Sequence, residues 1–396
     1  MDIRKYRYRV MQSIYFDNAS TSFPKARGVG EAMKGYLEEF GCNVGRGGYQ
    51  KAYAVSKKVY EVRKKLCHFF DAEESKNVIF TSNITQALNT VIKGLLKPGD
   101  HVLISGLEHN AVLRPLYHMR LQGISYDVIP CDLQGQLQIN SMDGLIKKKT
   151  KAIIMTHGSN ICAAMLPIKE VGSFCRRKGL FFIVDTAQTA GSHKISMKDD
   201  LIDALCFTGH KGLLGPQGIG GFLISESMVE GLDTMIDGGT GSLSDCLEMP
   251  EILPDRFEAG TLNLPGIYGL DKALDEVMQR NYLEIQTKEQ QLMDTFVKGI
   301  KKIEGICLVG GTMIKNKECC PVLSIDCEKK DNAVVAFELD QNYGIMTRVG
   351  LHCAPLAHKT LGSFPKGTLR FSFSASNTEE EIQIALKALS EIMEKM

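Results

Sequence analysis

Cys353 has the most unusual surroundings of the side chains that could do chemistry in this sequence. It lies in "RVGLHCAPLAHKTLG", residues 348–362, a polar stretch marked by Gly and Pro, whereas most of the chain's twelve cysteines lie in apolar runs. Reactive thiols prefer partly exposed, electropositive surroundings, and we expect His352, Arg348 and His358 to favour the thiolate. The pattern therefore favours a nucleophile over the alternative, a small thiol that fills a core.

A lysine and a carboxylate form a second pair of candidates. Lys211 follows an apolar run and precedes a glycine-rich turn in "DALCFTGHKGLLGPQGIGG", where a lone lysine would ordinarily be a solvated cation. Asp185 ends the very apolar run in "FFIVDTAQTAG", where a carboxylate is costly unless a cation or donor pairs with it. Pyridoxal phosphate (PLP) would satisfy both, because its carbonyl carbon bonds a lysine and its ring nitrogen pairs with a carboxylate.

Other polar residues that follow apolar runs suit the rest of such a cofactor. Thr85 lies near the start of the helix expected in "FTSNITQALNTVIKGL", and helix N-terminal amides with a hydroxyl suit a phosphate. An ordinary N-cap is the alternative there, and both can hold at once. His109, in "ISGLEHNAVLRPL", is placed to stack on the ring, although a lone histidine is more often only hydrogen-bonded. Asn160, in "MTHGSNICAAMLPI", is placed to donate to the ring oxygen.

The pattern of strands and helices that must position these residues predicts an α/β protein. Short apolar runs alternate with helical patterns, which favours a mostly parallel sheet covered on both faces. Ligands of such sheets bind outside the carboxyl ends of the strands, where the polar residues gather. The expected strands are "NVIFTSN", "HVLIS", "SYDVIP", "KAIIMTH", "LFFIVDTA", "ALCFTGH" and "GIGGFLIS".

The sequence divides into three parts. We expect residues 26–265 to form a large cofactor-binding domain and residues 266–396 a smaller α+β domain with a long helix that breaks near Asn281. Residues 1–25 would pack with the small domain, residues 1–10 being a possible extension outside the fold. The Cys353 segment, residues 342–366, is expected to be a loop.

Composition sets limits on the function. The formal net charge is +1, which gives no global field for nucleic acid or an anionic membrane, so a small-molecule substrate is expected. No apolar run approaches the roughly 18 residues of a membrane helix, and no secretory signal is visible. The cysteines therefore read as reduced cytoplasmic thiols. Their spacing, with His and Asp, shows no metal-ligand pattern, so no metal is expected.

Taken together, these motifs resemble the class V aminotransferase-fold enzymes, specifically the cysteine desulfurases and selenocysteine lyases. The resemblance runs from about Ile14 to the C-terminus and implies a fold type I, PLP-dependent homodimer with a seven-stranded, mostly parallel sheet. The "RxGxHCA" form is similar to that of group II desulfurases. The anchoring stretches are "YFDNAST", "NVGRGG", "EHNA", "DTAQ", "GHKGLLGPQGIG", "RFEAGTLN" and "RVGLHCAP" with "TLRFSFSASNTEEEI".

The resemblance assigns roles around the cofactor ring. Lys211 would hold PLP and shuttle the substrate's α-proton, while Asp185 would pair with the ring nitrogen. Gln188 would bond the ring oxygen, and His109 would stack on the ring.

The resemblance also assigns residues that would bind the two anionic groups, the cofactor phosphate and the substrate carboxylate. Thr85, Thr208 and His210 would bind the phosphate, and Thr261 would complete that site from the partner subunit. Arg370, in "GTLRFSFS", would bind the substrate carboxylate through two parallel hydrogen bonds, a task for which lysine is a poor substitute. Asn160 would be the second substrate-binding residue. Without the resemblance, Arg370 would be read as an edge or surface residue.

The implied reaction converts L-cysteine to L-alanine, with the sulfur received by Cys353 as a persulfide for delivery to an acceptor protein. A selenocysteine lyase would share every PLP residue, and an aminotransferase would release a keto acid without needing Cys353. A non-catalytic module is disfavoured by the intact Lys211, Asp185 and Arg370. Leu351 and Asn110 differ from the residues that the family pattern has at these positions. The identity of the sulfur acceptor and the choice between cysteine and selenocysteine as substrate therefore stay open.

Overall fold

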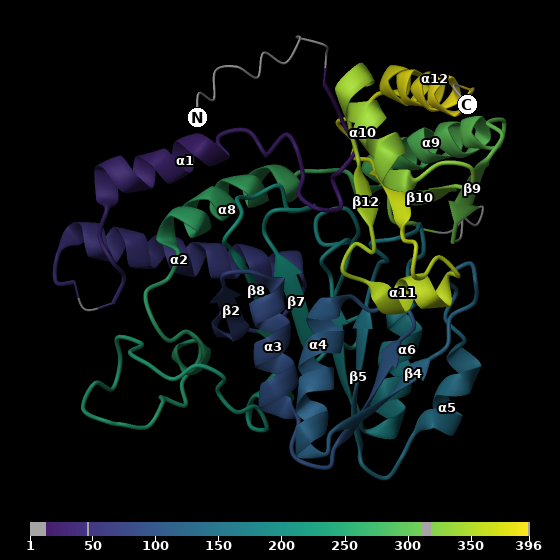
Figure 1. Ribbon diagram of the computed structural model, residues 1–396. Coiled ribbons are helices and arrows are strands. Elements are labelled where there is room, and N and C mark those ends of the chain that lie inside the picture. Colours follow the sequence, from purple (N-terminus) through teal and green to yellow (C-terminus); the bar gives the residue numbers. More distant parts are fainter. Residues whose placement is uncertain (1–12, 46, 311–317, 395–396) are drawn as a thin grey trace.

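The computed structural model describes residues 13–45, 47–310 and 318–394 (Figure 1). A seven-stranded sheet forms the base, with strand order β2-β8-β7-β6-β5-β3-β4, and a smaller layered unit carries the C-terminal residues. The possible extension at residues 1–10 lies outside the described residues.

All seven expected strands of the large sheet are confirmed. Neighbouring strands run parallel except at β8, which is antiparallel to both β2 and β7. The α/β fold with a mostly parallel sheet is therefore confirmed. The strands are β2 (Val78–Thr81), β3 (His101–Ser105), β4 (Ser125–Ile129), β5 (Thr150–Thr156), β6 (Phe181–Asp185), β7 (Ala204–Thr208) and β8 (Gly220–Ile224).

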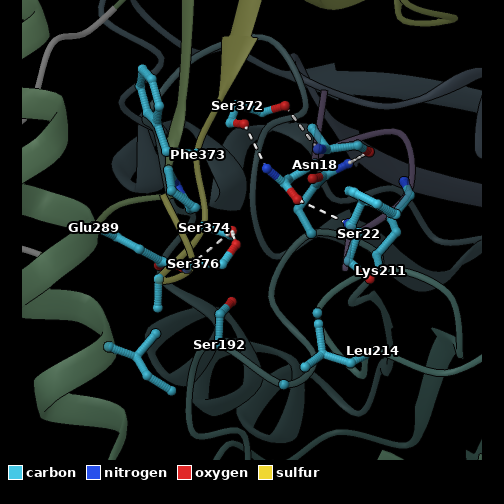
Figure 2. A pocket seen from close by; sticks show the side chains of 18 of the residues that line it. Asn18, Ser22, Ser192, Lys211, Leu214, Glu289, Ser372, Phe373, Ser374 and Ser376 are labelled. Carbon is cyan, nitrogen blue, oxygen red and sulfur yellow. Dashed lines mark hydrogen bonds between the residues drawn. The ribbon is translucent and has the colours of Figure 1, made fainter. Parts of the chain in front are cut away.

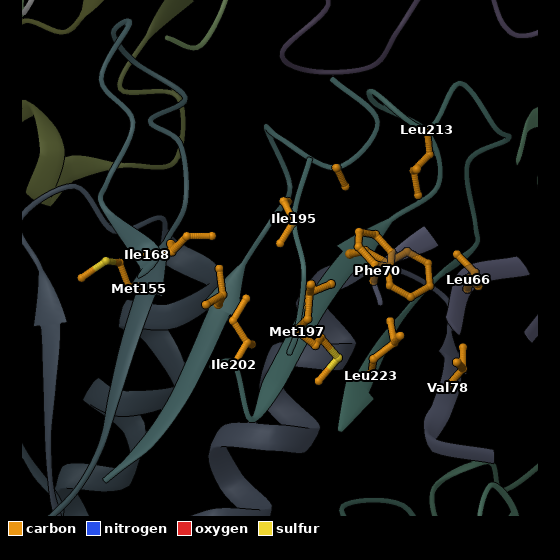
Figure 3. Close-up of a cluster of buried hydrophobic side chains, with 14 of the residues drawn as sticks. Leu66, Phe70, Val78, Met155, Ile168, Ile195, Met197, Ile202, Leu213 and Leu223 are labelled. Carbon is orange, nitrogen blue, oxygen red and sulfur yellow. The ribbon is translucent and has the colours of Figure 1, made fainter. Parts of the chain in front are cut away.

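Helices cover both faces of this sheet. Successive strand residues point to opposite sides, and the residues on both sides are apolar. Ile153 and Met155 of β5 belong to one buried cluster, and Ile154 between them belongs to another. Figure 3 shows part of the first cluster, in which Phe70 packs near Leu66 from α2. The helices around the sheet are α2 (Gln50–Phe69), α3 (Ile84–Leu95), α4 (Asn110–Met119), α5 (Met142–Leu145), α6 (Ile168–Lys178), α7 (Glu226–Val229) and α8 (Leu264–Val277).

A second, antiparallel sheet with its own apolar cluster organises the C-terminal part. The strand order is β12-β13-β10-β9, and α9, α10 and α12 pack with it. The bounds are β9 (Ile306–Val309), β10 (Val322–Cys327), β12 (Arg348–Gly350), β13 (Thr368–Ser372), α9 (Tyr282–Ile300), α10 (Asn332–Tyr343) and α12 (Glu379–Glu394). The expected break near Asn281 is confirmed, since α8 ends at Val277 and Asn281 caps α9 by accepting from the Leu283 N–H.

Residues 14–17 pack against this C-terminal part. β1 (Ile14–Tyr15) pairs in parallel with β11 (Ile345–Met346), and Asp17 bridges to Ser372. The chain then continues through α1 (Val29–Gly35) and a π-helical turn (Tyr36–Phe40). The proposed boundary near residue 265 stays a prediction.

The expected loop at residues 342–366 was only partly right. It contains β11, β12 and the short helix α11 (Pro355–Thr360), which Pro355 begins because its fixed φ suits the first helical position. Cys353 lies in the turn between β12 and α11. Among the described residues, no helix is long and apolar enough to cross a membrane, and no group of three His, Cys, Asp or Glu side chains is placed to hold a metal ion.

The aromatic packing of α9 gives a stability prediction. Phe296 is fully buried, with ring centroids 4.7 Å from Phe371 and 5.5 Å from Phe373. Phe296→Ala should destabilise the protein by about 3–5 kcal/mol, because it leaves a cavity in the core. Leu283→Ala, on the same helix but 72% exposed, is the control and should lower the thermal midpoint far less. Equal losses in the two variants would contradict this account of the core.

Candidate active site

Lys211 and Asp185 lie at the carboxyl edge of the large sheet. Asp185 ends β6 and is 3% exposed, and its Oδ1 accepts from the Ala187 N–H at 2.9 Å. Lys211 follows β7, the strand that pairs with β6. The parallel register therefore brings the two strand ends together, as the sequence predicts.

Burial shifts both groups toward their neutral forms. It lowers the pKa of Lys211 from 10.5 to about 8, with the charges of Arg370 and Arg348 adding to the effect and Asp185 opposing it. It raises the pKa of Asp185, while the Ala187 N–H and Lys211 act to lower it. A lysine with a pKa near neutrality can exchange a proton at physiological pH, which is the property a proton shuttle needs.

His109 is held as a neutral ring at the start of α4. Its Nδ1 accepts from the Ala111 N–H at 3.0 Å, so the neutral ring carries its proton on Nε2. Burial lowers the His109 pKa to about 4, with Lys211, Arg114 and Arg370 lowering it further. A neutral, fixed imidazole is suited to stacking on an aromatic ring.

The phosphate candidates leave polar atoms without partners. The Thr208 hydroxyl oxygen and His210 Nδ1 are both buried and have no hydrogen-bond partner among the described residues. Buried polar atoms rarely stay unpaired, so each of these two atoms suits a bond to an anionic group. Thr85 is exposed near the N-terminus of α3, where free N–H groups and the helix dipole favour an anion. The donor set therefore fits the phosphate of PLP.

Cys353 and His109 share a cavity. The cavity has a volume of about 460 Å³, and Thr85, Asn110 and Arg114 also line it. Cys353 is exposed, unlike the buried thiols of Cys162, Cys206 and Cys320. The chain thus presents an accessible thiol beside the candidate cofactor residues.

The backbone around Cys353 is held in an unusual conformation. His352 and Cys353 have φ angles of 47° and 59°, in the left-handed region that residues other than Gly seldom adopt. The Asn110 N–H donates to the Cys353 carbonyl at 2.7 Å, and the Asn160 side chain donates to the His352 carbonyl at 2.8 Å. These contacts hold the thiol beside the start of α4.

The expected charge of the two neighbouring histidines was wrong. Burial lowers the pKa of His352 to about 2 and that of His358 to about 4, so both rings are neutral at physiological pH. His358 Nδ1 contacts the Ser363 hydroxyl at 2.7 Å, and neither histidine supplies a positive charge to Cys353. Among the three residues named for that role, only Arg348 carries a permanent charge.

Arg370 is buried at the centre of a polar cluster. It is 2% exposed, and its Nη1 donates to the Asn160 carbonyl at 3.1 Å. Its Nη2 donates to Asp17 Oδ1 and to the Ser20 hydroxyl, both at 2.7 Å. The sequence reasoning did not assign Asp17 and Ser20, although both lie in the motif "YFDNAST", whose charged residue after an apolar run was an available signal.

Gln188 and Lys211 line a second cavity, of about 220 Å³ (Figure 2). Figure 2 shows Lys211 and Leu214 on one wall and Glu289 of α9 on the opposite wall. The Gln188 side chain donates to the Ala19 carbonyl at 3.1 Å, and that of Asn160 to the His352 carbonyl, so each amide has a backbone partner in this structure. Their bonds to the ring oxygen stay predictions.

Thr261 does not line the cavity that Thr85 lines. It lines a different cavity, with Tyr60, Arg63 and Gly239, and is exposed. The residues that line this cavity do not include Thr208 or His210, and the role of Thr261 in the phosphate site stays a prediction.

Comparison with known proteins places this arrangement in a family. The model of the family described as aminotransferase class-V matches residues 14–385. The chain belongs to this family. The predicted family resemblance is confirmed, and class V membership indicates a PLP-dependent enzyme.

The class V relatives include proteins named cysteine desulfurases. A probable cysteine desulfurase from Methanothermobacter thermautotrophicus is 32% identical, over 99% of this chain and 97% of the relative. The apo cysteine desulfurase from Thermococcus onnurineus NA1 superimposes with a TM-score of 0.89 at 31% identity, covering 97% and 95% of the two chains. The Escherichia coli cysteine desulfurase CsdA, a structure of its S-sulfonic acid form, gives a TM-score of 0.86 at 25% identity, covering 96% and 95%.

The unpartnered Thr208 hydroxyl gives a test of cofactor binding. Thr208→Val should weaken PLP retention roughly tenfold or more, because a hydrogen bond to a charged group contributes about 1.5–3 kcal/mol. The fold should survive, since the hydroxyl has no partner to lose among the described residues. Equilibrium dialysis against PLP measures the effect.

Thr186→Val is the matched control for Thr208→Val. The Thr186 hydroxyl donates to the Cys206 carbonyl at 2.8 Å, so this variant should lose stability with little change in PLP affinity. Unchanged PLP retention in Thr208→Val would remove Thr208 from the phosphate site.

The lowered pKa of Lys211 predicts a pH-dependent stability of the cofactor-free protein. Between about pH 8 and pH 10.5 the unfolded chain binds more protons at this lysine, so stability rises with pH in that window. Lys211→Met should be more stable than wild type at pH 7, with the difference disappearing by pH 10.5. Thermal midpoints at several pH values measure it. Lys194→Met, at an exposed site, is the control, and an equal pH dependence in Lys211→Met and wild type would contradict the assignment.

Proposed function

We propose that this protein is a PLP-dependent cysteine desulfurase that converts L-cysteine to L-alanine and transfers the sulfur to Cys353. The observation on which this proposal mainly rests is the exposed Cys353 thiol, which lines the same cavity as His109 and Thr85. The class V membership and the similarity to proteins named cysteine desulfurases support the reaction. An aminotransferase would have no use for such a thiol.

The residues that would hold PLP are those at the carboxyl edge of the sheet. Lys211 would bond the cofactor, Asp185 would pair with its ring nitrogen, and His109 would stack on the ring. Thr208 and His210, with their unpartnered buried atoms, would receive the phosphate. When bound, PLP supplies an electron sink that withdraws electron density from the substrate's α-carbon.

The chain's own residues then divide the work. Arg370 binds the substrate carboxylate and fixes its orientation, and the Lys211 amine takes the α-proton and later returns one to carbon. The Cys353 Sγ, as thiolate, attacks the substrate sulfur. An S–S bond forms as the C–S bond breaks, and the electron pair of the C–S bond goes to the substrate carbon, which gains a proton to give alanine.

We further propose a homodimer in which each subunit completes the other's phosphate site. Thr261 lines a cavity whose lining residues do not include Thr208 or His210. The exposed side chains of Tyr53 and Tyr60 on α2 support an interface near this residue, because Tyr60 lines the same cavity as Thr261. The proposed site of action is the cytoplasm, and the proposed final recipient of sulfur is an acceptor protein.

The first measurement is alanine formation from L-cysteine by the PLP-loaded protein. Wild type should form alanine and carry a persulfide on Cys353, and Cys353→Ser should lose at least about a hundredfold in rate, because it lacks the attacking thiolate. Cys246→Ser, at another exposed cysteine, is the matched control and should keep wild-type activity.

The substrates separate the competing functions. Alanine from selenocysteine alone, in wild type and Cys353→Ser equally, would replace the desulfurase with a selenocysteine lyase. A keto acid as the product would instead identify an aminotransferase.

A further inference from the structure

Two arginines lie directly opposite each other in the small sheet. β12 and β13 are antiparallel, and their register pairs Arg348 with Arg370. Like charges at opposed cross-strand positions destabilise a sheet. Arg370 is almost fully buried and Arg348 is 47% exposed, so the buried partner in particular needs a counter-charge.

Asp17 supplies that counter-charge from the start of the chain. Its Oδ1 accepts from Arg370 Nη2 at 2.7 Å, and its Oδ2 lies 3.6 Å from Arg348 Nη1. The Ser20 hydroxyl accepts from both guanidiniums at 2.7 Å and donates to Asp17 Oδ1. One carboxylate thus faces two guanidiniums, and a single further carboxylate would balance the charge.

The hydrogen bonds of Arg370 leave no free pair of neighbouring donors. Nη1 donates to the Asn160 carbonyl, and Nη2 donates to Asp17 and Ser20. The buried Nε has no partner among the described residues. A carboxylate that bonds Arg370 through two parallel N–H groups would use Nη2 together with either Nε or Nη1, so it must take an Nη2 hydrogen from Asp17 or Ser20.

We propose that the Asp17 carboxylate occupies Arg370 until substrate arrives and then moves to Arg348 as the substrate carboxylate takes its place. This exchange rests on the proposed function, because it assumes an amino-acid substrate. It makes Asp17 a residue that sets the affinity for the substrate carboxylate, and it makes Arg348 the recipient of the displaced charge.

The surrounding backbone suits an exchange confined to side chains. Asp17 forms a bridge to Ser372, and the flanking Phe16 N–H donates to the Met346 carbonyl at 2.9 Å, which fixes the Asp17 backbone. Asp17 Oδ2 already lies 3.6 Å from Arg348, so a small rotation completes the new ion pair. Arg348 belongs to β12, the strand that leads into the Cys353 turn.

A pair of ligands tests the exchange without turnover. L-Alanine and ethylamine carry the same amine, and only alanine has a carboxylate. Dissociation constants for the PLP-loaded protein come from calorimetry. Asp17→Asn keeps the shape and one acceptor oxygen, and it should tighten alanine binding roughly tenfold, because a competing charge-assisted bond is removed. Ethylamine binding should change less than about threefold, since no carboxylate is involved.

Arg348→Gln gives the opposite expectation. Without the Arg348 guanidinium to receive it, the Asp17 carboxylate stays bound to Arg370, so alanine should bind several-fold more weakly. In the Asp17→Asn background, the same Arg348→Gln change should have little effect, because no charge remains to be received. Such non-additivity is the signature of coupled residues. Ser20→Ala alters no charge and should modestly raise the preference for alanine over ethylamine. This variant replaces Asp17→Asn in the test if Asp17→Asn does not fold.

Weaker alanine binding in Asp17→Asn would overturn the exchange and leave Asp17 as a support that orients Arg370. Equal effects of Arg348→Gln in both backgrounds would overturn it too. A wild type with no preference for alanine over ethylamine would refute the exchange together with the carboxylate role of Arg370. A preserved exchange in a protein that forms no alanine from cysteine would refute only the proposed reaction.

Discussion

Burial of opposite charges at one edge of a sheet is the constraint on which the site depends. Asp185 ends β6 and Lys211 follows the neighbouring β7, and burial shifts the pKa of each group toward its neutral form. Isolated ions in such a place would be costly, and the cost is offset only by partners held at fixed distances. The seven-stranded sheet and its helices provide that rigidity, because each strand end is fixed by the register of its neighbours.

The sequence predicted the sheet well because its strands are continuous apolar runs, and a run buried on both faces is recognisable without any partner. It also predicted that Lys211, Asp185 and His109 would lie at one edge, since parallel topology brings the carboxyl ends of strands together. Their chemical roles, and those of the other site residues, stay predictions.

The parts that sequence missed depend on distant contacts or on burial. Asp17 and Arg370 are separated by 353 residues, and no local pattern signals their pairing. The neutral state of His352 follows from desolvation and the nearby arginines, which the neighbouring residues in the chain do not reveal. The left-handed conformation of His352 and Cys353 likewise needs the folded turn around it.

The ion pair between Asp17 and Arg370 joins the two ends of the chain, and this has a consequence for synthesis. Chains emerge from the ribosome N-terminus first, so Asp17 is available long before its partner. The large sheet can form once β8 has been made, with Lys211 already in place. Arg370, the residue proposed to bind the substrate carboxylate, belongs to β13 and emerges much later. Under the proposed function, a nascent chain can therefore assemble its candidate cofactor residues well before the residue that would recognise an amino acid, so turnover would begin only when the protein is nearly complete.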